Sequence, residues 1–170
     1  MRWRRLARSG PILAMIVVAA ACQRGSSTPR PVQYRATSFR TGSPVSLADL
    51  KGRPVLLTSW ATWCSECRKE LPALERYREA HRRQDLTVVA VNVDGGGGGR
   101  LATDMVASFG LTMDLWTDSE DTFASTFAAL GVPTTVLVDR RGGIVHVWQG
   151  GIDLNDPTDL GLIRRTVGDG

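Results

Sequence analysis

The sequence predicts an α/β sandwich with a mixed central sheet. Apolar, β-branched runs at residues 55–59 and 86–93 flank a segment with helical periodicity, an order typical of a right-handed βαβ unit with parallel strands. A third apolar run, residues 134–139, is followed by a glycine-containing turn and by residues 144–148, which indicates an antiparallel hairpin. Roughly 140 residues follow the N-terminal segment, which is enough for one buried core.

The other elements follow from helical spacing and from glycine and proline. We expect short strands within residues 36–46, around a turn at residues 41–44, and one helical turn over residues 47–52. The long helix predicted over residues 66–82 contains Pro72, which should kink it. Further along, the sequence predicts a flexible loop at residues 95–99, a short extended piece at residues 115–118, and helices over residues 101–109, 121–130 and 157–167.

The N-terminal segment has the form of a secretory signal. Residues 2–8 are rich in arginine, and residues 11–21 are uncharged and largely apolar. A membrane span takes about 20 apolar residues, so a cleaved signal over residues 1–21 is favoured over a permanent transmembrane helix. The protein would then act in the cell envelope, with residues 22–35 as a flexible tether and residues 36–170 as the folded domain.

The sequence Ala19-Ala20-Ala21-Cys22 resembles a bacterial lipobox, with Ala19 in the place where leucine is usual. The resemblance implies that Cys22 is lipidated through its sulfur and becomes the mature N-terminus, which would anchor the protein to a membrane. Lipidation would also account for the odd number of cysteines, three, because the other two then form one pair. Plain cleavage near Ala21 and an uncleaved anchor are the alternatives.

The positive charge of the chain lies in its N-terminal segment. The net charge is +4, from 21 basic and 17 acidic residues, and residues 1–30 hold six arginines and no acid. Residues 31–170 therefore hold 15 basic and 17 acidic residues, a net charge of −2. There is also no basic stripe with interleaved aromatic residues, so we expect no nucleic-acid partner.

Cys64 and Cys67 lie where a predicted buried strand ends and a helix begins. There the helix dipole and unpaired backbone N–H groups favour a thiolate. A structural zinc site would need two more ligands, but the two histidines, His81 and His146, lie far apart in the sequence. A purely structural disulfide would close a tiny loop and add little stability. The pattern therefore predicts a dithiol–disulfide redox centre without metal or cofactor.

Several separated motifs resemble one family. Trp-x-x-Trp-Cys-x-x-Cys-Arg-x-Glu-x-Pro at residues 60–72 follows a buried strand, and further motifs occur in order at residues 47–55, 90–93 and 131–139. Together they are similar to the TlpA/ResA group of membrane-tethered thioredoxin-like proteins, over about residues 36–165. The resemblance implies a thioredoxin-like three-layer sandwich with a mixed central sheet, an N-terminal β extension and an insertion in the βαβ half.

The resemblance also implies roles for single residues. Cys64 corresponds to the exposed nucleophile, and Cys67 corresponds to the buried resolving thiol, which releases the substrate from a mixed disulfide. Pro133 stands where the family has a cis-proline, whose turn presents the backbone of Val132 to the substrate. Trp63 is expected to pack around the site and to contribute to substrate binding.

Two acidic residues bear on the chemistry of the cysteines. Thr58 stands where thioredoxins bury an aspartate, and Glu70 instead follows Cys67 by three residues, on the same helical face. In the resemblance Glu70 is a buried acid with a raised pKa that transfers protons with the cysteines; the alternative is an exposed acid paired with Arg68 or with an arginine of the next turn. Glu66 lies between the cysteines, where its charge disfavours a thiolate and so favours a reductant.

These features predict an exported thiol:disulfide oxidoreductase that reduces disulfides in other proteins. As the family implies, its substrates could include apocytochromes c or copper-site assembly factors, and a membrane thiol electron donor would re-reduce it; we expect a monomer. A disulfide oxidase or isomerase is the alternative within the same class. A copper-handling thioredoxin-fold module is an alternative from another class, although such proteins use Cys-x-x-x-Cys with a distant histidine. A peroxiredoxin would place its reactive cysteine in a different local sequence.

Overall fold

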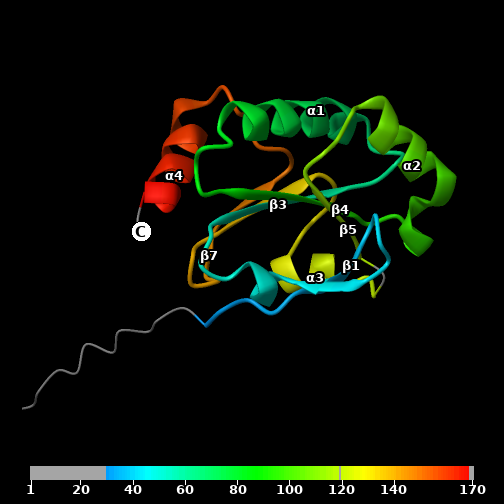
Figure 1. The fold of residues 1–170 in the computed structure, drawn as a ribbon, viewed down its shortest axis with the longest axis horizontal. Coiled ribbons are helices and arrows are strands. Elements are labelled where there is room, and N and C mark those ends of the chain that lie inside the picture. Colours follow the sequence, from blue (N-terminus) through cyan, green and yellow to red (C-terminus); the bar gives the residue numbers. More distant parts are fainter. Residues whose placement is uncertain (1–29, 119, 169–170) are drawn as a thin grey trace, which may run out of the picture.

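The computed structural model describes residues 30–118 and 120–168. The predicted signal, Cys22 and most of the predicted tether lie outside these residues. The described chain forms a seven-stranded sheet (Figure 1). Its strands are β1 Arg35–Ser38, β2 Pro44–Ser46, β3 Val55–Trp60, β4 Thr87–Asn92, β5 Asp114–Thr117, β6 Thr134–Val138 and β7 Ile144–Gln149. Their order across the sheet is β2-β1-β5-β4-β3-β6-β7.

Helices cover both faces of this sheet, so the predicted three-layer sandwich is confirmed (Figure 1). The described helices are α1 Ser65–Ala80, α2 Gly99–Ser108, α3 Phe123–Phe127 and α4 Pro157–Gly168, with the 3-10 helices η1 Leu47–Leu50 and η2 Gly95–Gly98. α1, α2 and α4 pack on one face, and α3 packs on the other face with the N-terminal part of the domain. No helix of the described residues has the length and apolar character needed to cross a membrane.

The strand pairings make the sheet mixed, as predicted. β3, α1 and β4 form the βαβ unit, because β3 and β4 run parallel from Val55 opposite Thr87 to Trp60 opposite Asn92. β4 and β5 are also parallel, whereas β6 is antiparallel to both β3 and β7. The hairpin of β1 and β2 is the predicted β extension and pairs with β5. The resemblance implies an insertion in the βαβ half, and directly after β4 the chain adds η2, α2 and β5 before α3.

The central strand β3 positions the cysteine pair. All six of its residues are buried, and successive side chains point to opposite faces of the sheet. Leu56 and Trp60 enter the core beneath α1, α2 and α4, whereas Leu57 enters the core on the α3 side. Because β3 ends at Trp60 and α1 begins at Ser65, Cys64 lies at the junction of strand and helix, as predicted.

Two predictions between β4 and β6 differ from the structure. The predicted helix over residues 121–130 is wrong in extent, because Ala128 adopts a left-handed φ of 53° and ends α3 at Phe127. Residues 95–99, predicted to be a flexible loop, form η2 and the first residue of α2. Here residues 96–99 all have φ between 53° and 78°, a region that glycine reaches at little cost.

The packed chain begins before residue 36, the predicted start of the domain. Tyr34 is only 2% exposed, and its ring lies 5.1 Å from Phe127 and 5.7 Å from Phe123 between ring centroids. Further upstream, the backbone N–H of Val32 donates to the carbonyl of Gly142 at 2.8 Å. The core on the α3 side is therefore closed by residues that the sequence patterns assigned to the tether.

Candidate redox site

Cys64 and Cys67 form a disulfide at the first turn of α1, with an S–S distance of 2.05 Å. Cys64 is the N-cap residue, and its sulfur accepts a hydrogen bond from the backbone N–H of Cys67 at 3.1 Å. Cys64 is 5% exposed and Cys67 is 0% exposed. Cys64 is thus the more accessible of the two, but it is less exposed than predicted, because it packs in the same core as Trp60 and Leu71.

Glu70 lies buried one helical turn beyond Cys67, with an exposure of 8%. Its Oε1 accepts hydrogen bonds from the backbone N–H of Ile152 at 2.9 Å and from the Thr135 hydroxyl at 3.0 Å, and its Oε2 lies 3.3 Å from the Thr58 hydroxyl. Burial raises the pKa of Glu70, although each of these hydrogen bonds opposes the rise.

The alternative position for Glu70, exposed and paired with Arg68, is wrong. The Arg68 guanidinium instead donates to the carbonyl of Thr62 at 2.7 Å. Thr58 stands where thioredoxins have an aspartate, and its hydroxyl contacts the Glu70 carboxylate. Glu70 therefore places a carboxylate next to that position. Its catalytic role stays a prediction.

The Val132–Pro133 peptide bond is cis, and it directly precedes β6. The backbone N–H of Thr134 donates to the Ser59 hydroxyl at 2.9 Å, which ties the start of β6 to the end of β3. Gly151 brings the proline and the acid together: a Cβ on Gly151 would lie 3.2 Å from Oε1 of Glu70 and 3.5 Å from Cγ of Pro133. A side chain at residue 151 would therefore crowd the Glu70 carboxylate.

Sequence reasoning missed two groups that shape this site. One is the Gly151-Ile152 pair, which supplies the closest backbone donor to Glu70. The other is Asp94, which is 8% exposed and accepts hydrogen bonds from the Thr62 N–H at 2.9 Å, the Thr62 hydroxyl at 3.1 Å and the Asn92 amide at 2.8 Å. Asp94 thereby holds the loop two residues before Cys64. Asp94 follows a buried strand at the sheet edge where parallel strands end, and this placement could have predicted that it lies near the site.

Trp63, which was predicted to pack around the site and to contribute to substrate binding, has a side chain that is 72% exposed. It lies on one side of a groove of about 220 Å³, which we call the Trp63 groove. Val132 also lines this groove, whereas Pro133 is buried. The full lining is Ser59, Trp63, Val93, Asp118, Asp121, Phe123, Ala124, Ala129, Leu130, Gly131 and Val132.

The described residues contain no group of three or more His, Cys, Asp or Glu side chains that could hold a metal ion. His81 stacks on Tyr77, with 4.1 Å between ring centroids, and His146 packs edge-on against Trp148 at 4.5 Å. Both histidines therefore lie in aromatic pairs.

The fold and the cysteine pair define the class of protein: a thioredoxin-like sandwich with a disulfide at the start of the helix that follows its central strand. The chain belongs to the AhpC/TSA family, whose model matches residues 33–147.

Individual relatives carry more specific names. The chain is 31% identical over 111 residues to the thiol-disulfide oxidoreductase ResA of Geobacillus kaustophilus, covering 65% of this chain and 62% of that protein. It is 32% identical over 110 residues to ResA of Bacillus subtilis, covering 64% and 60%. Its match thus spans about three fifths of the length of these curated relatives. Among solved structures, the thioredoxin domain of the thiol-disulfide oxidoreductase BVU-2223 from Bacteroides vulgatus is similar with a TM-score of 0.66 and 25% identity, covering 82% of this chain and 96% of that one.

Proposed function

We propose that the protein is a thiol:disulfide oxidoreductase that reduces disulfides in other proteins. The observation that carries this proposal is the Cys64–Cys67 disulfide at the start of α1, with the buried carboxyl of Glu70 one turn away. The names of the ResA relatives support the same class of reaction.

The reaction begins from the reduced protein. The Cys64 thiolate attacks one sulfur of the substrate disulfide; a Cys64–substrate S–S bond forms, the substrate S–S bond breaks, and the leaving thiolate takes up a proton. Cys67 then loses its proton and attacks the sulfur of Cys64. The second substrate thiolate leaves, and the Cys64–Cys67 disulfide forms. Two electrons have passed to the substrate, and a thiol donor must return two electrons before the next turnover.

Glu70 is the group best placed to take the proton of Cys67. It follows Cys67 by one helical turn, and burial raises its pKa towards the range in which a carboxyl can both accept and release protons near neutral pH. The helix dipole at the N-cap supports the thiolate form of Cys64.

The reductase direction rests on Glu66, which stands between the two cysteines in the sequence. Its negative charge disfavours the thiolate form of the cysteines. Lys69 lies 2.9 Å from the Glu66 carboxylate and offsets part of this charge, and both side chains are exposed. The influence of Glu66 on the reduction potential is therefore modest, and a measured potential above that of the glutathione couple would favour the oxidase alternative.

The proposal includes a place of action. The signal-like residues 1–21 and the lipobox-like sequence before Cys22 support export and a lipid anchor in the cell envelope, where a membrane thiol donor would re-reduce the protein. Cytochrome c maturation and copper-site assembly are the settings that the TlpA/ResA resemblance implies.

A trapping experiment tests the reaction. In a Cys67→Ser variant the mixed disulfide through Cys64 cannot resolve, so protein partners should accumulate as thiol-sensitive adducts in the cell envelope. The matched control carries both Cys64→Ser and Cys67→Ser and should form none. If a folded Cys67→Ser protein traps no partner, or if the double variant traps as much, the proposal is wrong.

A further inference from the structure

We propose that the Trp63 groove selects substrates that carry a lysine or arginine next to the target cysteine. This rests on the proposed disulfide reduction and adds a substrate class to it. Two residues of the groove are direct sequence neighbours of the reaction centre: Trp63 precedes Cys64, and Val132 precedes Pro133. A substrate residue within one or two positions of its cysteine can therefore reach it.

The groove carries exposed apolar surface. The two most exposed large hydrophobic side chains of the described chain, Leu130 at 88% and Trp63 at 72%, both line it. Exposed apolar surface of this kind marks places where another molecule is bound. Leu130 is held out here because α3 stops at Phe127, three residues earlier, and because the Leu130 N–H donates to the side chain of Gln149 at 3.0 Å.

The charges of the groove are of one sign. Among the described residues that line it, two are acidic and none is basic. The Asp118 carboxylate is buried and accepts hydrogen bonds from the N–H groups of Thr122 and Phe123 at 3.1 and 2.8 Å, so it acts through its field. Asp121 is exposed and is the acid that a bound side chain can touch.

A long cationic side chain matches both properties. Lysine and arginine lay their methylene groups along apolar surface and keep the charged end at its edge. Here the stem would lie along Leu130 and Val132, while the charge would meet the face of Trp63 and the carboxylate of Asp121. A purely apolar side chain would leave the charge of Asp121 unused, and an acidic one would be repelled by it.

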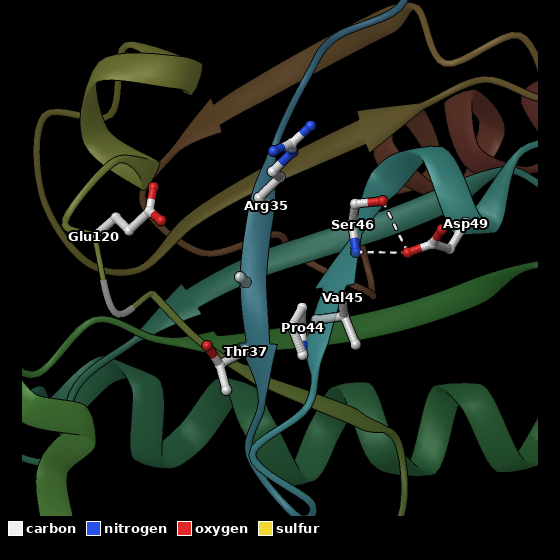
Figure 2. Close-up of a pocket in the computed structure, with 8 residues that line it drawn as sticks. Arg35, Thr37, Pro44, Val45, Ser46, Asp49 and Glu120 are labelled. Atoms are coloured by element: carbon white, nitrogen blue, oxygen red, sulfur yellow. Dashed lines mark hydrogen bonds between the residues drawn. The ribbon is translucent and has the colours of Figure 1, made fainter.

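The loop that carries Asp121 offers a matched control. Glu120, the neighbouring residue, lines a different pocket. Most of that pocket is formed by residues of β1 and β2, Arg35 among them (Figure 2). Glu120→Gln thus removes one negative charge from the same loop outside the Trp63 groove. Asp121 has a left-handed φ of 55°, a conformation that asparagine adopts readily, so Asp121→Asn removes its charge without new strain.

The experiment compares three disulfide-bonded peptides that differ only in the residue beside the cysteine, which is lysine, leucine or glutamate. With the full chain in its reduced form, we expect the second-order rate constant for reduction of the lysine peptide to exceed that for the glutamate peptide about 3- to 10-fold. The ratio should shrink as salt is added. It should fall by at least half in Asp121→Asn and persist in Glu120→Gln. Equal rates for the three peptides, or a ratio that Asp121→Asn leaves intact, would overturn the proposal.

A binding measurement separates this proposal from the proposed reaction. If the reduced protein leaves the disulfide of every peptide intact, disulfide reduction is contradicted. The groove is then judged with peptides in which alanine replaces the cysteine, by NMR shifts of the Trp63 indole and the Leu130 amide. Larger shifts with the lysine peptide than with the glutamate peptide support the selectivity, and equal or absent shifts refute it.

Discussion

Three glutamates of α1 differ in what surrounds their carboxylates. Glu66 is exposed and paired with Lys69. Glu75 is buried, which raises the pKa of its carboxyl, but hydrogen bonds from Arg78, from the side chain and N–H of Thr112 and from a further backbone N–H outweigh burial, and the net pKa is lowered. Glu70 is buried without a cation among its hydrogen-bond partners, so desolvation prevails and its pKa is raised.

Replacement of Glu70 should therefore change how stability depends on pH. Because the pKa of Glu70 is raised in the folded protein, the stability it contributes is complete below the ordinary glutamate value of 4.5 and is lost as pH rises through the folded pKa. One proton can account for at most about 1.4 kcal/mol per pH unit. Glu70→Gln has no group to titrate, so its free energy of unfolding should rise relative to the native chain as pH increases above 4.5.

Urea unfolding of the oxidised protein at several pH values measures this effect. Glu66→Gln is the matched control, because it removes a carboxylate from the exposed side of the same helix. Parallel pH curves for Glu70→Gln and the native chain would show that the acid does not titrate as inferred.

At the residue scale, the sequence predicts contacts between groups that are close along the chain. It misses contacts between groups that are far apart in the chain and meet only in the fold. Cys64, Cys67 and Glu70 share one helix, so their spacing alone indicates that they lie together. The N–H of Ile152 comes from 82 residues further along and reaches Glu70 only through the sheet and the turn after β7.

At the scale of elements, the start of α2 depends on where the glycines stand. Gly98 is its N-cap, with a left-handed φ of 67°. A Cβ there would lie 2.7 Å from Oδ2 of Asp94 and 2.8 Å from Cβ of Ala102. Gly96 also has a left-handed φ, of 74°, but a Cβ there would have no atom within 4 Å. Substitutions at these two positions therefore distinguish the cost of backbone strain from the cost of a steric clash.

Substitution at these two glycines should have unequal cost. Gly96→Ala adds only the strain of a left-handed residue, about 1–2 kcal/mol. Gly98→Ala adds the same strain and a clash, for roughly 1–3 kcal/mol more. The clash cannot be relieved cheaply, because the Asp94 carboxylate is held by Thr62 and Asn92. Urea unfolding of both variants measures the difference, and equal losses would mean that Asp94 moves aside freely.

The elements themselves were predictable to different degrees. β3, α1, β4, β6 and β7 follow from long apolar runs and clear helical spacing, and their bounds lie within two residues of the prediction. α3 was overextended because Phe123, Phe127 and Leu130 share helical spacing, yet Ala128 turns left-handed and directs the chain to the cis-proline turn. The glycine run was interpreted as flexible because composition shows only which φ values a residue can adopt. It does not show which φ value the neighbouring residues impose.

At the scale of the molecule, the two cores on either side of the sheet are closed in different ways. α1, α2 and α4 cover the first core, which holds the cysteine pair. Over the second lie the short helices α3 and η1, and the N-terminal segment completes it (Figure 1). Tyr34 is the residue that does so, packing against Phe123, Phe127 and Trp116, with 6.4 Å between the centroids of Tyr34 and Trp116.

The folded domain should therefore lose stability if it is cut at residue 36, the start that the sequence patterns indicate. A fragment of residues 30–170 keeps Tyr34 and the hydrogen bond between Val32 and Gly142, whereas a fragment of residues 36–170 loses both. Removal of a large buried aromatic side chain costs about 3–5 kcal/mol. Tyr34→Ala in the longer fragment should reproduce most of the loss, because the side chain and not the length of the tether closes the core.

Thermal and urea unfolding of the two fragments and of the point variant measure this loss. Gln33→Ala is the matched control, because Gln33 adjoins Tyr34 but is exposed, with its side-chain amide donating to the carbonyl of Pro31 at 3.3 Å. It should unfold like the longer fragment. If the fragment of residues 36–170 were as stable as the longer one, the N-terminal segment would be a tether along its whole length, and the domain would begin at residue 36.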